Sequence, residues 1–156
     1  MNDLNSNLLA LLDQELNLMN RAVEILSRSY DICKKIGVKE NYSFEELTEF
    51  EALSSRFARL VDLLIQKIFR LIDELNLAPE GTVRDSVNRA EKNGLIESSE
   101  QLVEMRRLRN QVAHEYVVEK LTHIFERVIQ LTPILLDCIK RTQKYCHKTF
   151  LKNGPR

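Results

Sequence analysis

The sequence predicts an all-α protein, an antiparallel bundle of four main helices plus one short helix. Two observations lead to this fold class. Apolar residues recur at steps of three and four along most of the chain, and no window shows the strict alternation of a strand over several residues. Only four Gly and three Pro interrupt the chain, and 156 residues suit one domain. We therefore expect a single helical domain over residues 1–156, with the last few residues disordered.

The first two helices are expected from about Leu4 to Ile36 and from Ser43 to about Leu75. Gly37 supplies a C-terminal stop, because glycine takes the left-handed conformation there without steric cost. The segment from Ser43 to Glu46 has the pattern of a capping box, in which hydroxyl and carboxylate each satisfy an unpaired backbone N–H. The apolar stripes are Leu8, Leu12, Leu16, Met19, Val23, Leu26, Tyr30 and Cys33 in the first helix, and Phe50, Leu53, Phe57, Leu60, Leu64, Ile68, Leu71 and Leu75 in the second.

Two further capping signals follow. Thr82 with Asp85 opens a short helix of about three turns that Gly94 closes. Ser98 with Gln101 repeats the signal and opens the fourth helix.

The fourth helix is expected to place Arg106, Arg107 and Arg109 in its last turn, where cations complement the negative end of the helix dipole. A last long helix should run from about Glu119 to Leu151. Pro133 lies inside this last helix and lacks the N–H that a helix needs, so we expect a kink near Thr132, or a break with Thr132 as a new cap.

Composition gives few indications of function. Lys plus Arg equals Asp plus Glu at 23 each, so any binding of nucleic acid must come from a local patch. Three widely spaced Cys without a CxxC motif favour a reducing cytoplasm. No apolar run approaches the length of a membrane span, so we expect a cytoplasmic protein with no membrane association.

The segment RNQVAHEY, residues 109–116, gathers several chemically capable side chains. Arg109 can hold a phosphate, His114 can transfer a proton and Tyr116 can carry a modification. On a continuous helix Arg109 and His114 would point about 140° apart. We therefore expect the helix to end between them, or a second subunit to complete the site. From an extended segment, His114 and Tyr116 would project to one side.

The pattern of Arg109, Asn110, His114 and Tyr116 resembles the R-x4-H-x-Y signature of the HepT toxins, a branch of the HEPN family of small helical proteins. The resemblance extends over nearly the whole chain, including Pro133, and implies a HEPN-like, homodimeric fold. It implies a metal-independent endoribonuclease toxin, with RNA as substrate and Arg109 and His114 as catalytic residues. Asn110 would support them by orienting a phosphate or the imidazole. Tyr116 would accept AMP from a cognate MntA-like nucleotidyltransferase, the antitoxin that neutralises the toxin. We expect no metal and no cofactor.

Alternatives remain open. The chain could be a non-catalytic adapter or substrate-binding subunit of a nucleotidyltransferase, or a helical interaction protein in which RNQVAHEY only connects two helices. Arg56 or Asp62 could reach a site from the second helix, but charged residues on an exposed face are usually only solvated. The basic C-terminal helix could neutralise RNA phosphates or serve the helix dipole and solubility.

Overall fold

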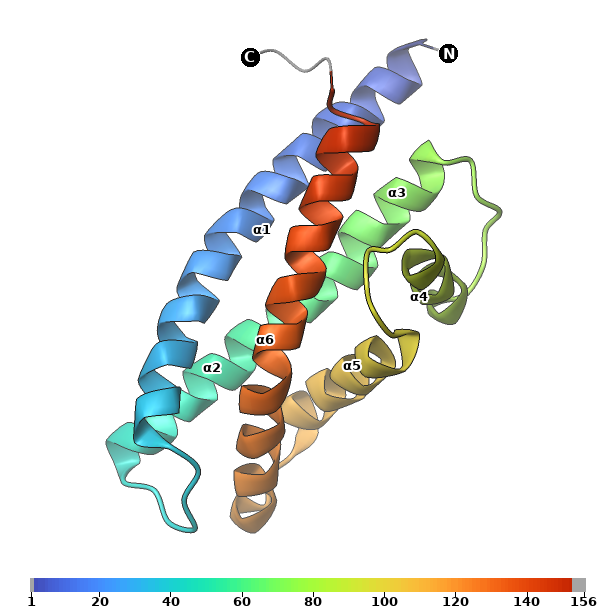
Figure 1. The fold of residues 1–156 in the computed structure, drawn as a ribbon. Coiled ribbons are helices and arrows are strands. Elements are labelled where there is room, and N and C mark those ends of the chain that lie inside the picture. Colours follow the sequence, from blue (N-terminus) through green and yellow to red (C-terminus); the bar gives the residue numbers. More distant parts are fainter. Residues whose placement is uncertain (1, 153–156) are drawn as a thin grey trace.

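Five helical segments form the fold in residues 2–152, the part of the chain that this computed structural model describes, and the second segment consists of three consecutive elements, α2, η1 and α3 (Figure 1). No strand occurs in that range, so the all-α class is confirmed. The expected disorder at the C-terminus falls on residues 153–156, which lie outside the described residues. The elements are α1 (Asn2–Ile36), α2 (Phe44–Asp62), a π-helical turn η1 (Leu63–Ile68), α3 (Phe69–Leu75), α4 (Val83–Lys92), α5 (Ser99–His114) and α6 (Val118–Thr149).

The local signals in the sequence set the ends of the first helices. Gly37 has φ +79°, and its N–H donates to the Cys33 carbonyl at 2.9 Å, which ends α1. The capping box at the start of α2 is formed: Glu46 N–H donates to Ser43 Oγ at 3.1 Å, and Ser43 N–H donates to Glu46 Oε1 at 2.9 Å. The equivalent box of Thr82 and Asp85 opens α4.

The second long helix contains one feature that its regular apolar stripe does not predict. Between α2 and α3 the backbone forms the π turn η1, in which Phe69 N–H donates to the carbonyl of Leu64, five residues before it. Helical φ and ψ angles continue through Asp62 and Phe69, so α2, η1 and α3 form one continuous rod. Turns of this kind are rare and often lie beside functional sites.

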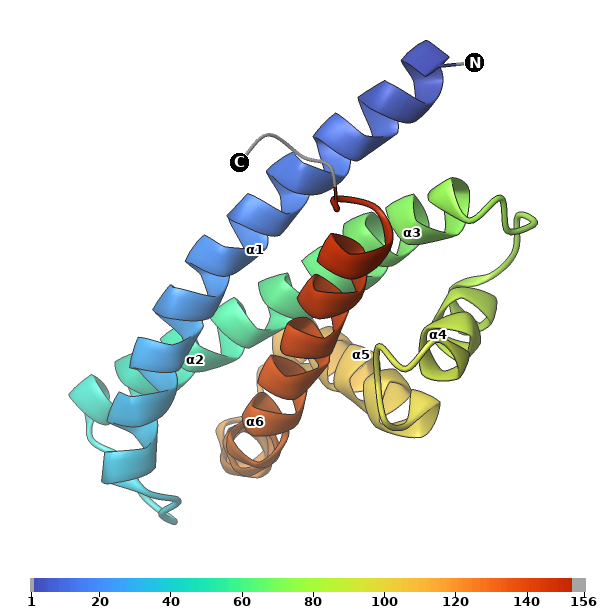
Figure 2. The ribbon, with the colours of Figure 1, turned by 45° about the horizontal axis from the view of Figure 1, so that its top comes forward.

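The α2–η1–α3 rod lies at the centre of the bundle. Helix α1 packs along one side of α2, and α5 packs on another. Helix α6 contacts α1, α2 and α5 (Figures 1 and 2). In Figure 1 the chain runs down α1, up through α2 and α3, down α5 and up α6, so neighbouring long segments alternate in direction.

The inner faces of these helices form one cluster of buried apolar side chains. Within this cluster, Phe50 stacks on Phe125, which brings the start of α2 against the first half of α6, with ring centroids 5.1 Å apart. The largest fully buried side chains are Phe50, Phe57, Phe69, Phe125, Leu12, Met19, Leu26, Leu53, Leu60, Leu64, Ile68 and Ile72. Most of them belong to the stripes in the sequence.

Helix α6 is continuous through Pro133, so the expected break at Thr132 does not occur. The Thr132 hydroxyl is buried and donates to the Val128 carbonyl at 2.6 Å, four residues before it. Thr132 therefore bonds within the helix and does not cap a new one.

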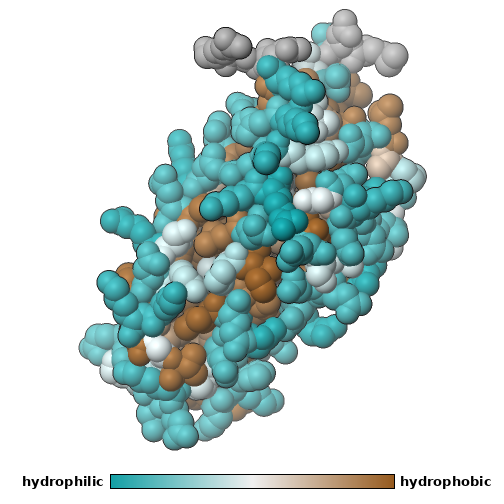
Figure 3. Space-filling model, in the orientation of Figure 1, coloured by the Kyte–Doolittle hydropathy of each residue, from teal (hydrophilic) through white to brown (hydrophobic). Residues whose placement is uncertain are grey.

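The face formed by α1 and α6 is mostly hydrophilic, with hydrophobic residues visible mainly in its lower half (Figure 3). None of the helices described in residues 2–152 is long and apolar enough to cross a membrane.

Candidate functional site

Most of the RNQVAHEY segment, residues 109–116, belongs to α5, and only its last two residues follow the helix. Helix α5 continues through Arg109 and Asn110 to His114, and Glu115 N–H still donates to the Gln111 carbonyl at 2.9 Å. The expectation that the helix ends between Arg109 and His114 is therefore wrong. Nothing in Asn110–Ala113 stops a helix, since this stretch lacks Gly and Pro. Arg109 and Asn110 lie inside α5, and His114 is its last residue.

Arg109 is held by a carboxylate from the central rod. Its Nε donates to Asp62 Oδ2 at 2.9 Å, and its Nη1 donates to Asn110 Oδ1 at 3.1 Å. Both partners in this ion pair are partly exposed, Arg109 by 34% and Asp62 by 39%. A guanidinium has five N–H donors; since two are used here, three remain for a ligand. Arg109 is therefore oriented by the protein and still able to bind a phosphate.

Two open grooves meet at this ion pair. The first, of about 510 Å³, is lined by Asp62, Leu63, Gln66, Lys67, Arg106, Arg109 and Asn110. The second, of about 370 Å³, shares Asp62 and Arg109 with the first and extends past Ala113 to Glu115 and the start of α6. The Asp62–Arg109 pair thus forms the ridge between the two grooves. Asp62 is the last residue before the π turn, so this irregularity lies directly beside the candidate site.

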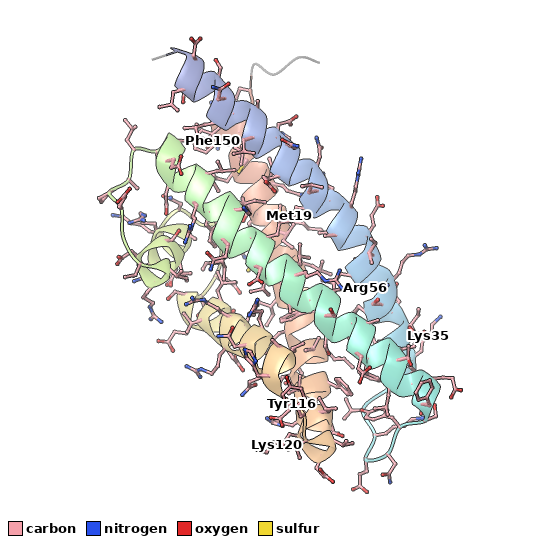
Figure 4. All side chains as sticks on the ribbon, turned by 180° about the vertical axis from the view of Figure 1, so that it is seen from behind. Met19, Lys35, Arg56, Tyr116, Lys120 and Phe150 are labelled. Atoms are coloured by element: carbon pink, nitrogen blue, oxygen red, sulfur yellow. The ribbon has the colours of Figure 1, made fainter. Side chains whose placement is uncertain are left out.

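His114 and Tyr116 lie away from the grooves, at the end of α5. The His114 side chain is exposed and lines none of the grooves around Arg109. Tyr116 follows in the non-helical link between α5 and α6, where its side chain is 87% exposed. Figure 4 shows Tyr116 at this end of the molecule, close to Lys120 in the first turn of α6. A non-helical link is present, as the sequence predicted, but it covers only residues 115–117 and is shorter than expected.

The structure therefore brings Arg109 and Asn110 together but does not bring His114 to Arg109. Five residues along a continuous helix correspond to a rotation of about 140° and a rise of about 7.5 Å. A phosphate bound by Arg109 in the groove would not face the imidazole of the same chain. The structure therefore excludes one of the two arrangements that the sequence left open, a helix end between these two residues.

Sequence reasoning gave too little weight to Asp62, Lys67 and Arg106. Asp62 was expected to be solvated, yet it is the ion-pair partner of Arg109. Lys67 and Arg106 line the same groove as this pair. Asp62 could be identified only from the packing of α2 against α5. The spacing of residues within one helix does not show which residues of another helix lie beside it.

Other reactive groups are remote from this site. Cys33, Cys138 and Cys146 are buried free thiols. Desolvation by burial raises the pKa of Cys33 and Cys138 to about 11 and that of Cys146 to about 12. Among the described residues, no group of three or more His, Cys, Asp or Glu is arranged to hold a metal ion.

The fold and the site define an all-α protein whose exposed Arg, His and Tyr lie on the last turns of one helix and the link that follows. The family model described as Ribonuclease HepT-like matches residues 19–142, from the middle of α1 to the second half of α6. The chain belongs to this family of HepT-like ribonucleases. No curated protein matches the sequence significantly.

Proposed function

We propose that this protein is a toxin endoribonuclease that cuts RNA with protein side chains alone. The observation that carries the proposal is the oriented, partly exposed guanidinium of Arg109 on the same helix as His114, in a chain of the HepT-like ribonuclease family. Arg109 would bind the scissile phosphate and offset charge in the transition state, and Asn110 would support it. His114 would transfer the proton.

The proposed reaction uses the substrate's own 2′-hydroxyl as nucleophile. An imidazole accepts the proton of the 2′-OH as that oxygen attacks phosphorus, and the 5′-oxygen leaves after it takes up a proton. The products are a 2′,3′-cyclic phosphate and a 5′-hydroxyl. No metal is required in this scheme.

We infer that the active form is a homodimer. Within one chain, Arg109 and His114 point about 140° apart around α5. A phosphate bound by Arg109 of one chain therefore needs the imidazole of a second chain. A two-fold axis beside the end of α5 would bring two copies of the segment into one cleft.

We propose that Tyr116 is the point of control. Its phenol is 87% exposed in the α5–α6 link, two residues after His114, so a partner enzyme can reach it. Transfer of AMP from an MntA-like nucleotidyltransferase would place a negative phosphate beside the imidazole, and both charge and bulk would oppose RNA binding. We also propose that residues 1–156 form a single domain and that the protein acts in the cytoplasm.

The test is ribonuclease activity of purified full-length protein and two alanine variants. His114→Ala and Arg109→Ala should each lower the rate of RNA cleavage by about 10²–10⁴-fold, in EDTA as in magnesium. The matched controls are His147→Ala, another exposed His on a helix, and Arg28→Ala, an exposed Arg on α1. Circular dichroism should show the same helical content in all four. Folded His114→Ala that cuts at the normal rate would overturn the catalytic role of His114, whereas unsubstituted protein that never cuts RNA would favour the adapter alternative.

A further inference from the structure

A row of cations continues from the candidate site along α5. The 510 Å³ groove beside Arg109 adjoins a third groove of about 250 Å³, because Arg106 and Asn110 line both. The cations that line these two grooves, besides Arg109, are Lys67 from η1, Arg84 from α4, and Arg106 and Arg107 from α5. All four are exposed, and none forms a salt bridge within residues 2–152.

Carboxylates are sparse on this side of Arg109. Among the residues that the structure describes, Asp62 is the only acidic one that lines either of these two grooves, and it is already paired with Arg109. The groove on the other side of the pair differs, because Glu51 and Glu115 line it. The charge along α5 is therefore asymmetric: basic from Arg109 toward α4, and mixed from Arg109 toward α6.

From this asymmetry we propose that single-stranded RNA binds along α5 on one side only of Arg109, with its phosphates on Lys67, Arg106 and Arg107. We call these three residues the cationic track. The inference rests on the proposed function, since it names the path that the substrate takes to the candidate site. Arg84 extends the track but adjoins Asp85 on α4, so we expect its contribution to be the smallest of the four.

The chemistry of the track fits an RNA backbone. Unpaired Lys and Arg bind phosphates and release counterions, and this term is independent of sequence. The chain carries no net charge, so attraction to RNA must come from a local surface of this kind. A single strand suits an open groove between the helices of one chain, because its backbone can follow the groove to the guanidinium of Arg109.

The test is binding of a fluorescent oligouridine to full-length protein in the His114→Ala background, where the RNA remains uncut. Anisotropy would be measured from 50 to 200 mM salt. We compare this protein with the same protein carrying Lys67→Gln, Arg106→Gln and Arg107→Gln. Three lost phosphate contacts should reduce the slope of log affinity against log salt by about 2 for a single strand. The protein with an intact track should then lose roughly 20-fold more affinity over this range than the variant.

A matched control removes the same charges elsewhere. Arg21→Gln, Arg28→Gln and Lys35→Gln together also remove two Arg and one Lys, all exposed on α1. Figure 4 shows Lys35 on the far side of α2 from α5. This control should keep the full salt slope. It also corrects for the change in net charge, which is the same in both triple variants.

The outcomes separate the track from the proposed function. If unsubstituted protein cuts RNA but both triple variants show the full slope, the track is wrong and the ribonuclease remains. If the slope of log affinity against log salt falls in the track variant only, while unsubstituted protein never cuts RNA, the track is supported and the nuclease assignment fails. If the protein neither binds nor cuts RNA, both are overturned.

Discussion

Asp62 and Arg109, 47 residues apart in sequence, form an ion pair in which Arg109 Nε donates to Asp62 Oδ2 at 2.9 Å. This contact fixes the guanidinium at the junction of two grooves. It ties the end of α2 to the C-terminal half of α5. Because both side chains are more than a third exposed, the pair should matter for position more than for stability.

Asp62→Ala should therefore reduce catalysis without unfolding the protein. A guanidinium that is no longer oriented would be misplaced by about 1 Å or more, which can lower kcat by up to about 10²-fold. The free energy of unfolding should change by less than about 1 kcal/mol. Asp62→Glu, which keeps the carboxylate, should restore part of kcat. Steady-state kinetics and thermal unfolding measure the two effects separately.

Asp73→Ala provides the opposite control. Asp73 accepts hydrogen bonds from Ser86 and from Nε and Nη2 of Arg89, and it is only 17% exposed. Its removal leaves these donors unsatisfied and should cost about 1–3 kcal/mol of stability, with kcat unchanged. An Asp62→Ala protein that loses stability but keeps full kcat would show that the Asp62 contact is only structural.

Mixing two inactive variants tests whether the site is shared between chains. In a mixed dimer of Arg109→Ala and His114→Ala, one of the two sites would combine an intact Arg109 from one chain with an intact His114 from the other. Random exchange of subunits should then restore about a quarter of normal activity. The measurement is RNA cleavage after co-refolding, with sedimentation to confirm dimers. Dimers that exchange fully and stay inactive would argue against the shared site.

Tyr116→Phe should separate cleavage from control. The variant lacks the hydroxyl that we propose as the AMP acceptor but keeps an aromatic side chain, so it should cut RNA at nearly the normal rate. Expressed with an active nucleotidyltransferase, the variant should stay toxic, whereas the unsubstituted protein should be silenced. Growth and the mass of the peptide containing Tyr116 are the measurements. Tyr30→Phe, on α1, is the matched control and should be silenced normally. AMP found on another residue would refute the role of Tyr116.

The three thiols should be inert in the native protein. Because burial raises the pKa of Cys33 and Cys138 to about 11, and of Cys146 to about 12, each thiol stays protonated at pH 7–9. An aromatic disulfide reagent should thus react slowly until denaturant unfolds the chain. All three should then react within seconds at the rate of free cysteine. Fast reaction of native protein at pH 8 would contradict this burial.

The helices could be predicted from the sequence because their signals are local. The capping box at Ser43 and the stop at Gly37 act within four residues, and both form as expected. The regular stripe from Phe50 to Leu75 gave the second helix. It could not reveal the π turn, because the apolar spacing continues through Leu64 and Ile68.

The site was only partly predictable, because its geometry depends on contacts between helices. Arg109 and Tyr116 could be selected from spacing, and the non-helical link at Tyr116 was expected. The partnership of Arg109 with Asp62 depends on how α5 lies against α2. The end of α5 was misplaced because it was inferred from a functional need, whereas the residues after Arg109 are compatible with helix.

The π turn also bears on how the length of the chain can change. A turn of i→i+5 bonds holds about one residue more than the α-helical turn it replaces. The extra residue lies within Leu63–Ile68, and the helices on both sides continue the same rod. A homologue shorter by one residue here could therefore keep the same core while changing only the groove wall beside Asp62. We therefore expect deletion of one residue within Leu63–Ile68 to change the candidate site more than the packing of the helices.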